Sequence, residues 1–467
     1  MNKNRILFLV DHKHRDLPSL ALMAFHLHAN GDDARLVALG SEEKIVKDFD
    51  PHFIVIPKPN YNFARLYLWK LSGRKIIVVD SEGNHQDKNL TMRIRLAPDL
   101  YCFWNAKMKQ KYEKTIARRG GKSEVLGFYR GDLLHQKYRG VYGSDLQLRE
   151  HYGVPKHGMV ITVATSTQDS HFSEKRRSAK AKRRAKAFSQ TAAYSSIVKN
   201  MTVLRDLTED FVVKISREFP HLTILVKPHP NENAAYWHDL INKVGNENLK
   251  LVVGEPINRM LQISNFHISH NVCTTTIEAM MAGVPTAEIH TDQSEHLYAE
   301  RHLYMADFIV RCWQDLKAPL TDALNTGLAS DTRLQVARGS RLQDYVHDFL
   351  YKFDGDRCEE YADYLSGYMK IFGDKRKLHF GLALAHPWLT LTFLGASLRA
   401  WMANLRRSFT RFGSLEESVN YPDRNKSENY VEIDGVLVHK EFGLYDNRMS
   451  LGDELLWYEK FKSAREQ

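Results

Sequence analysis

The chain has 467 residues, of which 43% are hydrophobic, 11% aromatic and 26% charged. This balance is typical of a soluble globular protein and excludes a disordered or fibrous chain, and the length predicts two or three domains. The net charge of +10 at pH 7 favours an anionic partner, such as a phosphorylated substrate, nucleic acid or an anionic lipid surface. Neither a disulfide framework nor a zinc ribbon is predicted, because no CxxC spacing joins the cysteines Cys102, Cys273, Cys312 and Cys358.

We expect the protein to act in the cytoplasm. The N-terminus leads directly into the apolar group Ile6 to Asp11, which is too short for a secretory signal and has no cleavage site behind it. Widely spaced cysteines also agree with a reducing compartment.

The first 130 residues alternate between β-rich runs and segments with helical spacing such as 17–30. The expected strands are Arg5–Val10, Ala34–Leu39, Phe53–Pro57, Lys75–Asp80, Asp99–Trp104 and Glu124–Phe128. Such alternation predicts a parallel sheet, and nearly continuous apolar strands indicate that helices cover both faces. We therefore expect a doubly wound α/β domain over residues 1–152.

A second series of strands follows the Gly- and Pro-containing break at 153–158. Its expected strands are Met159–Thr165, Leu222–Lys227, Leu249–Val253, Phe266–Ser269 and Thr286–Ile289. They predict a second doubly wound domain over 153–345, with the ligand between the domains, because ligands bind beyond the carboxyl ends of such strands. Residues 346–375 are expected to form helices that close the second domain, and 376–467 a mainly helical tail.

Lys227 and His229 follow a buried strand, and Pro228 and Pro230 stiffen the backbone that presents them. An imidazole and an ammonium at such a point suit a phosphate. The alternative is a proline-rich turn with a surface histidine, and the residues alone favour neither interpretation.

Three consecutive hydroxyl residues, Thr274, Thr275 and Thr276, precede a helix rich in Ala and Met. Hydroxyls, free backbone N–H groups and the helix dipole together form a phosphate cradle. Glu278, one turn inside the helix, is then placed to accept a hydrogen bond from a ribose hydroxyl. The alternative is an ordinary threonine cap on a structural helix, and pairing with His229 in the same domain favours the functional interpretation.

Two further strand ends carry carboxylates. Glu82 follows a strand of the first domain and is a candidate general base toward an acceptor hydroxyl, or else a turn residue that caps the next helix. Asp169 follows the first strand of the second domain, where it is a candidate nucleophile, an orienting group or simply a helix cap.

The first strand-to-helix loop is dense in polar groups, with Asp11, Lys13, Arg15 and Asp16, and such loops line clefts. The sequence lacks GxGxxG, GxxxxGK[ST] and HExxH at these positions, which argues against a dinucleotide dehydrogenase, a P-loop NTPase and a zincin. No metal site is predicted.

Residues 174–186 carry a basic run. It is a solvated insertion, a nucleic-acid arm or a contact for anionic lipid or glycan; nucleic acid is least favoured, because no aromatic interleaving or recognised nucleic-acid module accompanies the run. The basic residues are Lys175, Arg176, Arg177, Lys180, Lys182, Arg183, Arg184 and Lys186.

Residues 380–398 contain no acidic, Lys or Arg side chain and precede Arg399 and Arg406. A spanning helix is disfavoured because His386 and Pro387 interrupt the segment. An interfacial segment on the inner leaflet and a buried helical hairpin remain as alternatives.

The order of these motifs resembles bacterial surface-carbohydrate biosynthesis proteins of the GT-B glycosyltransferase superfamily. The related groups are capsule Kdo transferases, bacterial sialyltransferases and CDP-glycerol glycerophosphotransferases, and the resemblance covers about residues 5–300. The motifs that carry it are Ile6 to Asp11 with Lys13, Arg15, Asp16 and Leu17; Glu82-Gly83; Asp99 to Trp104; Leu126-Gly127 with Arg130 and Asp132; Lys227 to Pro230; and Thr275 to Pro285.

The resemblance implies that His229 and Thr274 to Thr276 hold the donor phosphate and that Glu82 faces the acceptor, with Arg130 and the loop 11–16 on the same side. One departure is that Ser81 precedes Glu82, where the sialyltransferase motif has two acids. Asp169 corresponds by position to the strand-end Asp implicated in catalysis in Kdo transferases. The superfamily implies metal-independent chemistry without a cofactor.

The leading functional hypothesis is a glycosyltransferase that moves a sugar from a CMP- or UDP-linked donor to a lipid-linked capsule or lipopolysaccharide acceptor. Its partners would be the nucleotide sugar, the lipid-linked glycan, anionic lipid of the cytoplasmic leaflet and other assembly proteins, without nucleic acid. The protein would then lie peripherally on the inner membrane. The alternatives are a CDP-glycerol-type phosphotransferase or UDP-sugar 2-epimerase of the same fold, and a non-catalytic assembly scaffold.

Overall fold

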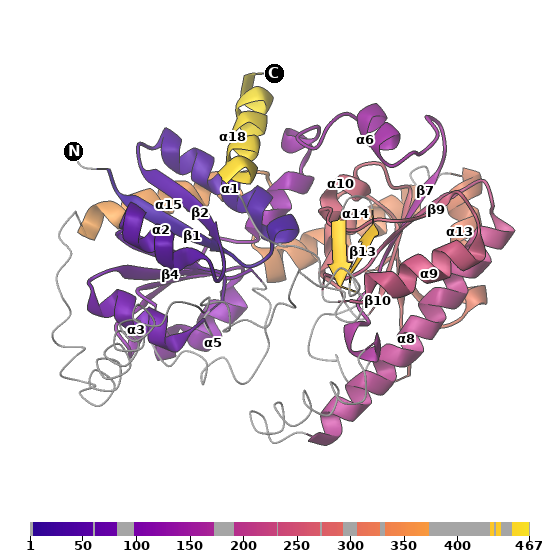
Figure 1. Cartoon of the computed structure of the whole chain (residues 1–467), viewed down its shortest axis with the longest axis horizontal. Coiled ribbons are helices and arrows are strands. Elements are labelled where there is room, and N and C mark those ends of the chain that lie inside the picture. Colours follow the sequence, from indigo (N-terminus) through magenta and orange to yellow (C-terminus); the bar gives the residue numbers. More distant parts are fainter. Residues whose placement is uncertain are drawn as a thin grey trace, which may run out of the picture.

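The protein consists of two α/β domains side by side, each built on a parallel sheet (Figure 1). The computed structural model describes residues 3–58, 61–81, 98–171, 191–230, 232–270, 273–292, 306–326, 332–372, 430–433, 436–439 and 451–466.

The first sheet has six strands in the order β2-β1-β3-β4-β5-β6, all parallel. Alternate residues of β1 point to opposite faces: Phe8 packs with α1, and Leu9 packs with residues of α2, α3 and α5. The predicted doubly wound arrangement is confirmed. The elements are β1 (Arg5–Val10), α1 (Lys13–Ala29), β2 (Asp33–Ala38), α2 (Glu42–Phe49), β3 (Phe53–Ile56), α3 (Phe63–Leu71), β4 (Lys75–Val79), β5 (Leu100–Phe103), α5 (Ala106–Ala117) and β6 (Lys122–Val125).

The second sheet also has six parallel strands, in the order β12-β11-β10-β7-β8-β9. Each of the five expected strands is present, whereas β12 was not predicted because it is only three residues long and mostly half-buried. The elements are β7 (Val160–Ala164), α8 (Thr191–Glu218), β8 (Thr223–Lys227), α9 (Ala234–Val244), β9 (Leu249–Leu251), α10 (Ile257–Leu261), β10 (Phe266–His270), α11 (Thr274–Met281), β11 (Thr286–Ile289), β12 (Phe308–Val310), α13 (Trp313–Thr326) and α14 (Thr332–Tyr345).

The chain crosses between the domains twice. The first crossing contains η1 (Tyr129–Leu134), η2 (Gln136–Tyr138) and α6 (Asp145–His151), and the second follows α14 through η5 (Val346–Leu350). The crossings contact each other where the Phe128 N–H donates to the Leu350 carbonyl at 3.1 Å. Gly127 has φ +90°, and a Cβ there would lie 2.9 Å from the same carbonyl oxygen, so this close approach requires glycine.

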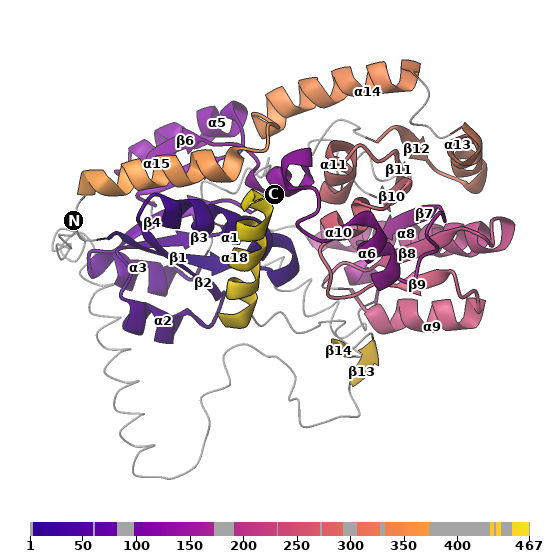
Figure 2. The same ribbon diagram turned by 90° about the horizontal axis from the view of Figure 1, so that it is seen from above.

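The helix after the second crossing, α15 (Arg357–Phe372), packs on the first domain, as Figure 2 shows. The expectation that it would close the second domain is therefore wrong. The reason is specific contact: the buried carboxylate of Asp132 accepts the N–H groups of Arg357 (3.1 Å) and Cys358 (2.6 Å) at the start of α15. Tyr361 then donates to the Gly127 carbonyl at 3.0 Å, and its ring is fully buried.

Parts of the tail also fold onto the molecule. Helix α18 (Leu451–Glu466) lies against α1, where the Trp457 ring meets Tyr142 edge to face at 5.6 Å and Phe461 is buried in the same core. β13 (Tyr430–Ile433) and β14 (Val436–His439) form an antiparallel pair.

None of the helices in the described part of the chain is long and apolar enough for a membrane span. The apolar run 380–398 lies outside the described residues.

The strand orders fix where a ligand site is expected. In the first sheet the direction of winding changes between β1 and β3, and in the second it changes between β7 and β10. Loops at the carboxyl ends of strands on either side of such a switch point separate and leave a crevice. The segments that begin at Asp11 and Thr165 lie at these two points.

Candidate functional site

The loop after β1 forms a compact charged network. The buried carboxylate of Asp16 accepts Nε of Arg15 at 2.8 Å and the backbone N–H of His12 at 3.1 Å. Lys58, at the end of the neighbouring strand β3, lies 3.0 Å from both carboxylate oxygens of Asp11. Arg15 also reaches Ser81 Oγ at 3.3 Å, after β4. Asp16 therefore orients the loop, while Asp11, Arg15 and half-buried Lys13 lie at the edge of the sheet.

His12 is a site residue that the sequence analysis did not single out. Its Nδ1 accepts the backbone N–H of Arg15 at 3.3 Å and so caps α1, which assigns the ring proton to Nε2. Nε2 is buried and has no hydrogen-bond partner among the described residues. Burial, together with the nearby charges of Arg15, His14, Lys227 and His229, lowers the pKa of His12 to about 2. His12 is therefore a neutral imidazole with an unused N–H donor.

The electrostatic effect of Lys227 and His229 on His12 crosses the domain boundary. The carboxyl end of β8 therefore faces the carboxyl end of β1. Burial lowers the pKa of Lys227, and the neighbouring carboxylates of Glu278 and Glu255 oppose that shift. The Lys227 ammonium therefore lies in the field of two carboxylates.

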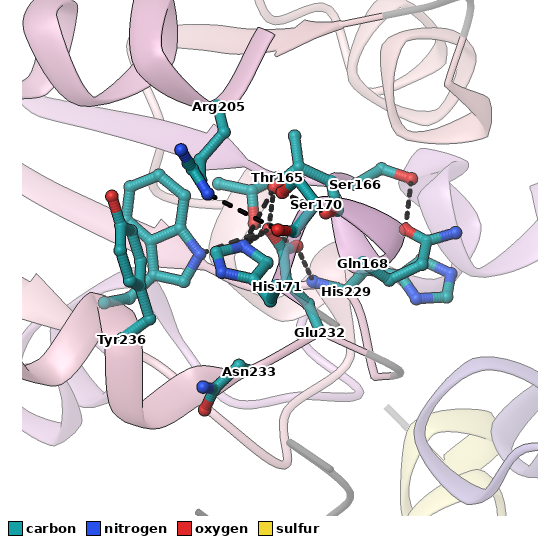
Figure 3. Close-up of polar contacts among 12 residues, drawn as sticks. Thr165, Ser166, Gln168, Ser170, His171, Arg205, His229, Glu232, Asn233 and Tyr236 are labelled. Carbon is teal, nitrogen blue, oxygen red and sulfur yellow. Dashed lines mark hydrogen bonds and ion pairs between the residues drawn. The ribbon is translucent and has the colours of Figure 1, made fainter. Parts of the chain in front are cut away.

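Glu232 lies behind His229 and was also not predicted. Its fully buried carboxylate accepts the His229 N–H at 3.2 Å, the Thr165 hydroxyl at 2.5 Å and Nε1 of Trp237 at 3.2 Å (Figure 3). The available sequence signal was an acidic residue three positions after a strand-end histidine. Its partners could not be read from the sequence, because Thr165 lies 67 positions earlier.

The three threonines at the start of α11 do not act alike. Thr274 is exposed, whereas the Thr275 hydroxyl lies 3.2 Å from Nε2 of His267 and the Thr276 hydroxyl donates to Glu288 at 2.7 Å. No side chain caps the helix at Cys273. The hydroxyls of Thr275 and Thr276 thus bind within the domain, and Thr274 with the first backbone N–H groups remains at the site edge.

Arg130 and Glu278 bring the two predicted halves of the site together. The Arg130 guanidinium is 2% exposed, and its Nη1 lies 3.9 Å from Glu278 Oε1 and 4.0 Å from Asp16 Oδ1. It also lies over the rings of Trp104, at 5.8 Å, and Phe128, at 5.1 Å. Burial raises the pKa of Glu278, and Arg130 counteracts the rise.

The other predicted residues fall into two groups. Asp169 is buried in η3 (Gln168–His171), directly after β7. Glu82 lies outside the described residues, as do Lys175, Arg176, Arg177, Lys180, Lys182, Arg183, Arg184 and Lys186. In the described part of the chain no three His, Cys, Asp or Glu side chains are grouped so as to hold a metal ion.

The sequence matches no protein-family model, and no curated protein sequence matches it. Solved structures do match. One variant of the wall teichoic acid polymerase TagF has a TM-score of 0.54 at 13% identity, covering 80% of this chain and 90% of that chain. Another TagF variant has a TM-score of 0.52 at 12% identity, with coverage of 80% and 90%. A putative UDP-N-acetylglucosamine 2-epimerase from Listeria monocytogenes has a TM-score of 0.48 at 9% identity, with coverage of 80% and 99%.

Similarity at this level of identity concerns the fold. Together with the two parallel sheets, it confirms the predicted fold class, a GT-B arrangement of two doubly wound domains.

Proposed function

We propose that this protein is a GT-B glycosyltransferase that moves a sugar from a nucleotide-linked donor to a hydroxyl group of a lipid-linked surface-polysaccharide acceptor. The observation that carries the proposal is that Nη1 of Arg130 lies 4.0 Å from Asp16, at the start of α1, and 3.9 Å from Glu278, in α11 of the other domain, so that the strand ends of the two sheets meet. Cationic and N–H donor groups from both domains thus converge on one crevice, as an anionic donor held between the domains requires.

The donor phosphate would bind to Lys227, His229 and the backbone N–H groups at the start of α11. A helix of eight residues begins there, and no side chain occupies its cap. When the sugar is transferred, negative charge develops on the departing nucleotide phosphate. Fixed donors at that point stabilise the charge without reorganising, which lowers the barrier.

Glu82 is the proposed base toward the acceptor hydroxyl. Support comes from its neighbour Ser81, which is buried at the end of β4 and lies 3.3 Å from Arg15 of the loop after β1. Asp169, in the loop after β7, remains the second candidate for a catalytic carboxylate. We assign no metal or cofactor, because Lys227, His229 and the first N–H groups of α11 would balance the charge of the donor phosphate.

A second candidate reaction is transfer of a glycerol phosphate unit from a CDP-linked donor. It is favoured by the similarity in fold to the TagF polymerase, one of whose structures, with a TM-score of 0.51, follows a soak with CDPG. The same donor-phosphate groups would serve, but the acceptor oxygen would attack phosphorus instead of an anomeric carbon. The fold would also suit a UDP-sugar 2-epimerase or a non-catalytic scaffold.

The decisive experiment measures nucleotide release from CMP-, UDP-, GDP- and CDP-linked donors by the full-length protein. We expect turnover with one class, and its loss in His229→Ala. His221→Ala is the matched control, because His221 is exposed and precedes β8 at the opposite end of the strand. Release of CMP from CDP-glycerol would select the second candidate. No binding or turnover with any donor would refute the transferase proposal and favour the scaffold.

Turnover in EDTA tests the metal-independent assignment separately. We expect an unchanged rate after dialysis against EDTA. A rate that falls and returns with Mg²⁺ or Mn²⁺ would contradict it. The proposed location on the inner membrane is tested by cosedimentation with anionic vesicles.

A further inference from the structure

Glu232 is a buried acid that accepts five hydrogen bonds beside the loops after β7 and β8, and the proposed chemistry does not use it. Its side chain is fully buried, and both of its oxygens already accept hydrogen bonds from the protein. Oε2 accepts the Thr165 hydroxyl at 2.5 Å and the His229 N–H at 3.2 Å. Oε1 accepts the Thr167 hydroxyl, Nε1 of Trp237 at 3.2 Å and Nε2 of His171 at 3.2 Å.

These five donors offset the free-energy cost of burying the Glu232 carboxylate. A carboxylate in a protein interior is strongly unfavourable unless its lone pairs are used. Although burial alone would raise the pKa of Glu232, its hydrogen bonds with His171, Thr165 and Thr167 lower it to about 2. Glu232 is therefore ionised throughout the physiological range.

The donors come from segments that the sheet places side by side. Thr165 and Thr167 belong to the loop after β7, and His229 belongs to the loop after β8; β7 and β8 are neighbouring strands with Ala164 opposite Lys227. A second bond strengthens this junction, because the Thr165 N–H donates to the Lys227 carbonyl at 3.0 Å. The Ser166 N–H in turn donates to Nε2 of His270, at the end of β10, at 3.0 Å.

We propose that Glu232 is a positioning residue for the donor. It holds the loop after β7 against the His229 loop, so that both loops keep fixed positions around the phosphate of a nucleotide-linked donor. This inference rests on the proposed function. It predicts that the ligand affinity, and not only the stability, depends on the carboxylate. The effect passes through His229 and the segment 165–168.

Glu232→Gln is the informative substitution because it keeps the shape of the side chain. One oxygen becomes an NH2 group, which faces N–H or O–H donors on either side of the original carboxylate. The threonine hydroxyls can rotate away, but the N–H groups of His229 and Trp237 cannot. Thr165→Val removes one bond and leaves the charge, so it tests the same contact between the loops if the glutamine variant fails to fold.

Asp307→Asn is the matched control. Asp307 is also a buried carboxylate of the second domain and accepts the Thr286 N–H at 2.8 Å, but it lies at the amino end of β11, away from the crevice. Any loss of affinity that comes only from weakening the domain should therefore appear in this variant as well.

The test is calorimetric titration of each full-length variant with CMP, CDP and UDP, with thermal unfolding measured in parallel. For the nucleotide that wild type binds, we expect Kd to rise at least tenfold in Glu232→Gln and three- to tenfold in Thr165→Val. In Asp307→Asn, Kd should change less than twofold. The double variant of Glu232 and Thr165 should bind no more weakly than Glu232→Gln alone, because both substitutions loosen the same contact between the loops.

The backbone amide of His229 gives a direct readout. Its proton resonance should move upfield in Glu232→Gln and stay in place in Asp307→Asn. Unchanged affinity in a folded Glu232→Gln or Thr165→Val protein would overturn the inference while the proposed function stands. If wild type binds none of the nucleotides and turns over no donor, the proposed function fails, and the positioning role fails with it.

Discussion

Nη1 of Arg130, from the first domain crossing, lies 3.9 Å from Oε1 of Glu278 in the second domain. The same nitrogen is 4.0 Å from Asp16 of the first domain, and among the described residues neither Nη1 nor Nε has a hydrogen-bond partner. One buried cation thus lies between two acids from opposite domains.

Replacing Arg130 tests this arrangement. Arg130→Met keeps a long side chain that packs on Trp104 and Phe128. Glu278 loses its ion-pair partner, while Asp16 keeps its pair with Arg15. We expect the free energy of unfolding to fall by about 3 kcal/mol, as for other broken buried pairs. The measurement is urea denaturation of Arg130→Met, Glu278→Gln and the double variant. The double variant should lose less than the sum; simple additivity would show that the two groups are not coupled.

Buried histidines should make stability depend on pH. Burial lowers the pKa of His12 to about 2, of His267 to about 3 and of His270 to about 4, whereas unfolded histidine titrates near 6.5. The unfolded state therefore binds more protons below pH 6.5, so the stabilisation is complete above pH 6.5 and is lost as the pH falls toward 4. Each histidine contributes about 1.4 kcal/mol per pH unit in this window.

Groups with raised pKa values work in the opposite direction. Burial raises the pKa of Asp132 to about 6, so its protonation stabilises the native state as the pH falls through 6. The sharpest comparison is therefore between wild type and His267→Gln, in urea titrations from pH 7.5 to 4.5. The variant should show a shallower loss below pH 6.5. Parallel curves would contradict the assignment for His267.

The unused N–H of His12 should matter for transfer. His12→Asn retains a residue that caps helices well, so α1 should persist, but the asparagine cannot place a donor at the position of Nε2. We expect donor turnover to fall about 100-fold, the scale seen when one preorganised donor is removed. The control is His14→Asn, whose ring lies 5.9 Å away. Equal losses in both variants would indicate a disturbed loop instead of a specific donor.

Lys227 should make the affinity for nucleotide fall at alkaline pH. Because burial lowers the pKa of this lysine below its usual 10.5, its ammonium deprotonates at a lower pH than an exposed lysine. Affinity for the anionic donor should therefore weaken at a lower pH than the usual lysine value of 10.5 would predict. In Lys227→Met we expect about tenfold weaker binding at pH 7.5 and a flatter pH profile. Titrations at four pH values check both; an unchanged slope in the variant would assign the limit to another group.

The aromatic face of α18 should be part of the core of the first domain. Phe461 packs with Phe25 and Tyr138, and Phe→Ala substitutions in cores cost about 3 kcal/mol or more. Phe461→Ala should lower the free energy of unfolding by that amount. Leu456→Ala, at a position 54% exposed on the same helix, should change it by less than about 0.5 kcal/mol. Equal small effects would show that the helix does not dock in solution.

Most strands could be predicted because each is a short apolar run closed by polar or turn-forming residues. β1 begins and ends where expected, and the position of Lys227 at a strand end followed from the run before it. The half-buried β12 is an apolar run of only three residues, which is too short to stand out. Helix α15 could be predicted as a helix but not assigned to a domain, since its attachment depends on Asp132, which lies 225 positions before Arg357.

The amino-acid sequence by itself determined the two doubly wound domains and the strand ends that carry the charged groups, because periodicity and turn chemistry act between near neighbours. Only the tertiary structure decided which of those groups meet. It brought His12 to Lys227, placed Arg130 between two domains, turned Thr275 and Thr276 inward and gathered five donors around Glu232. Burial and pairing arise between distant segments, and these set the charge and the partner of each side chain.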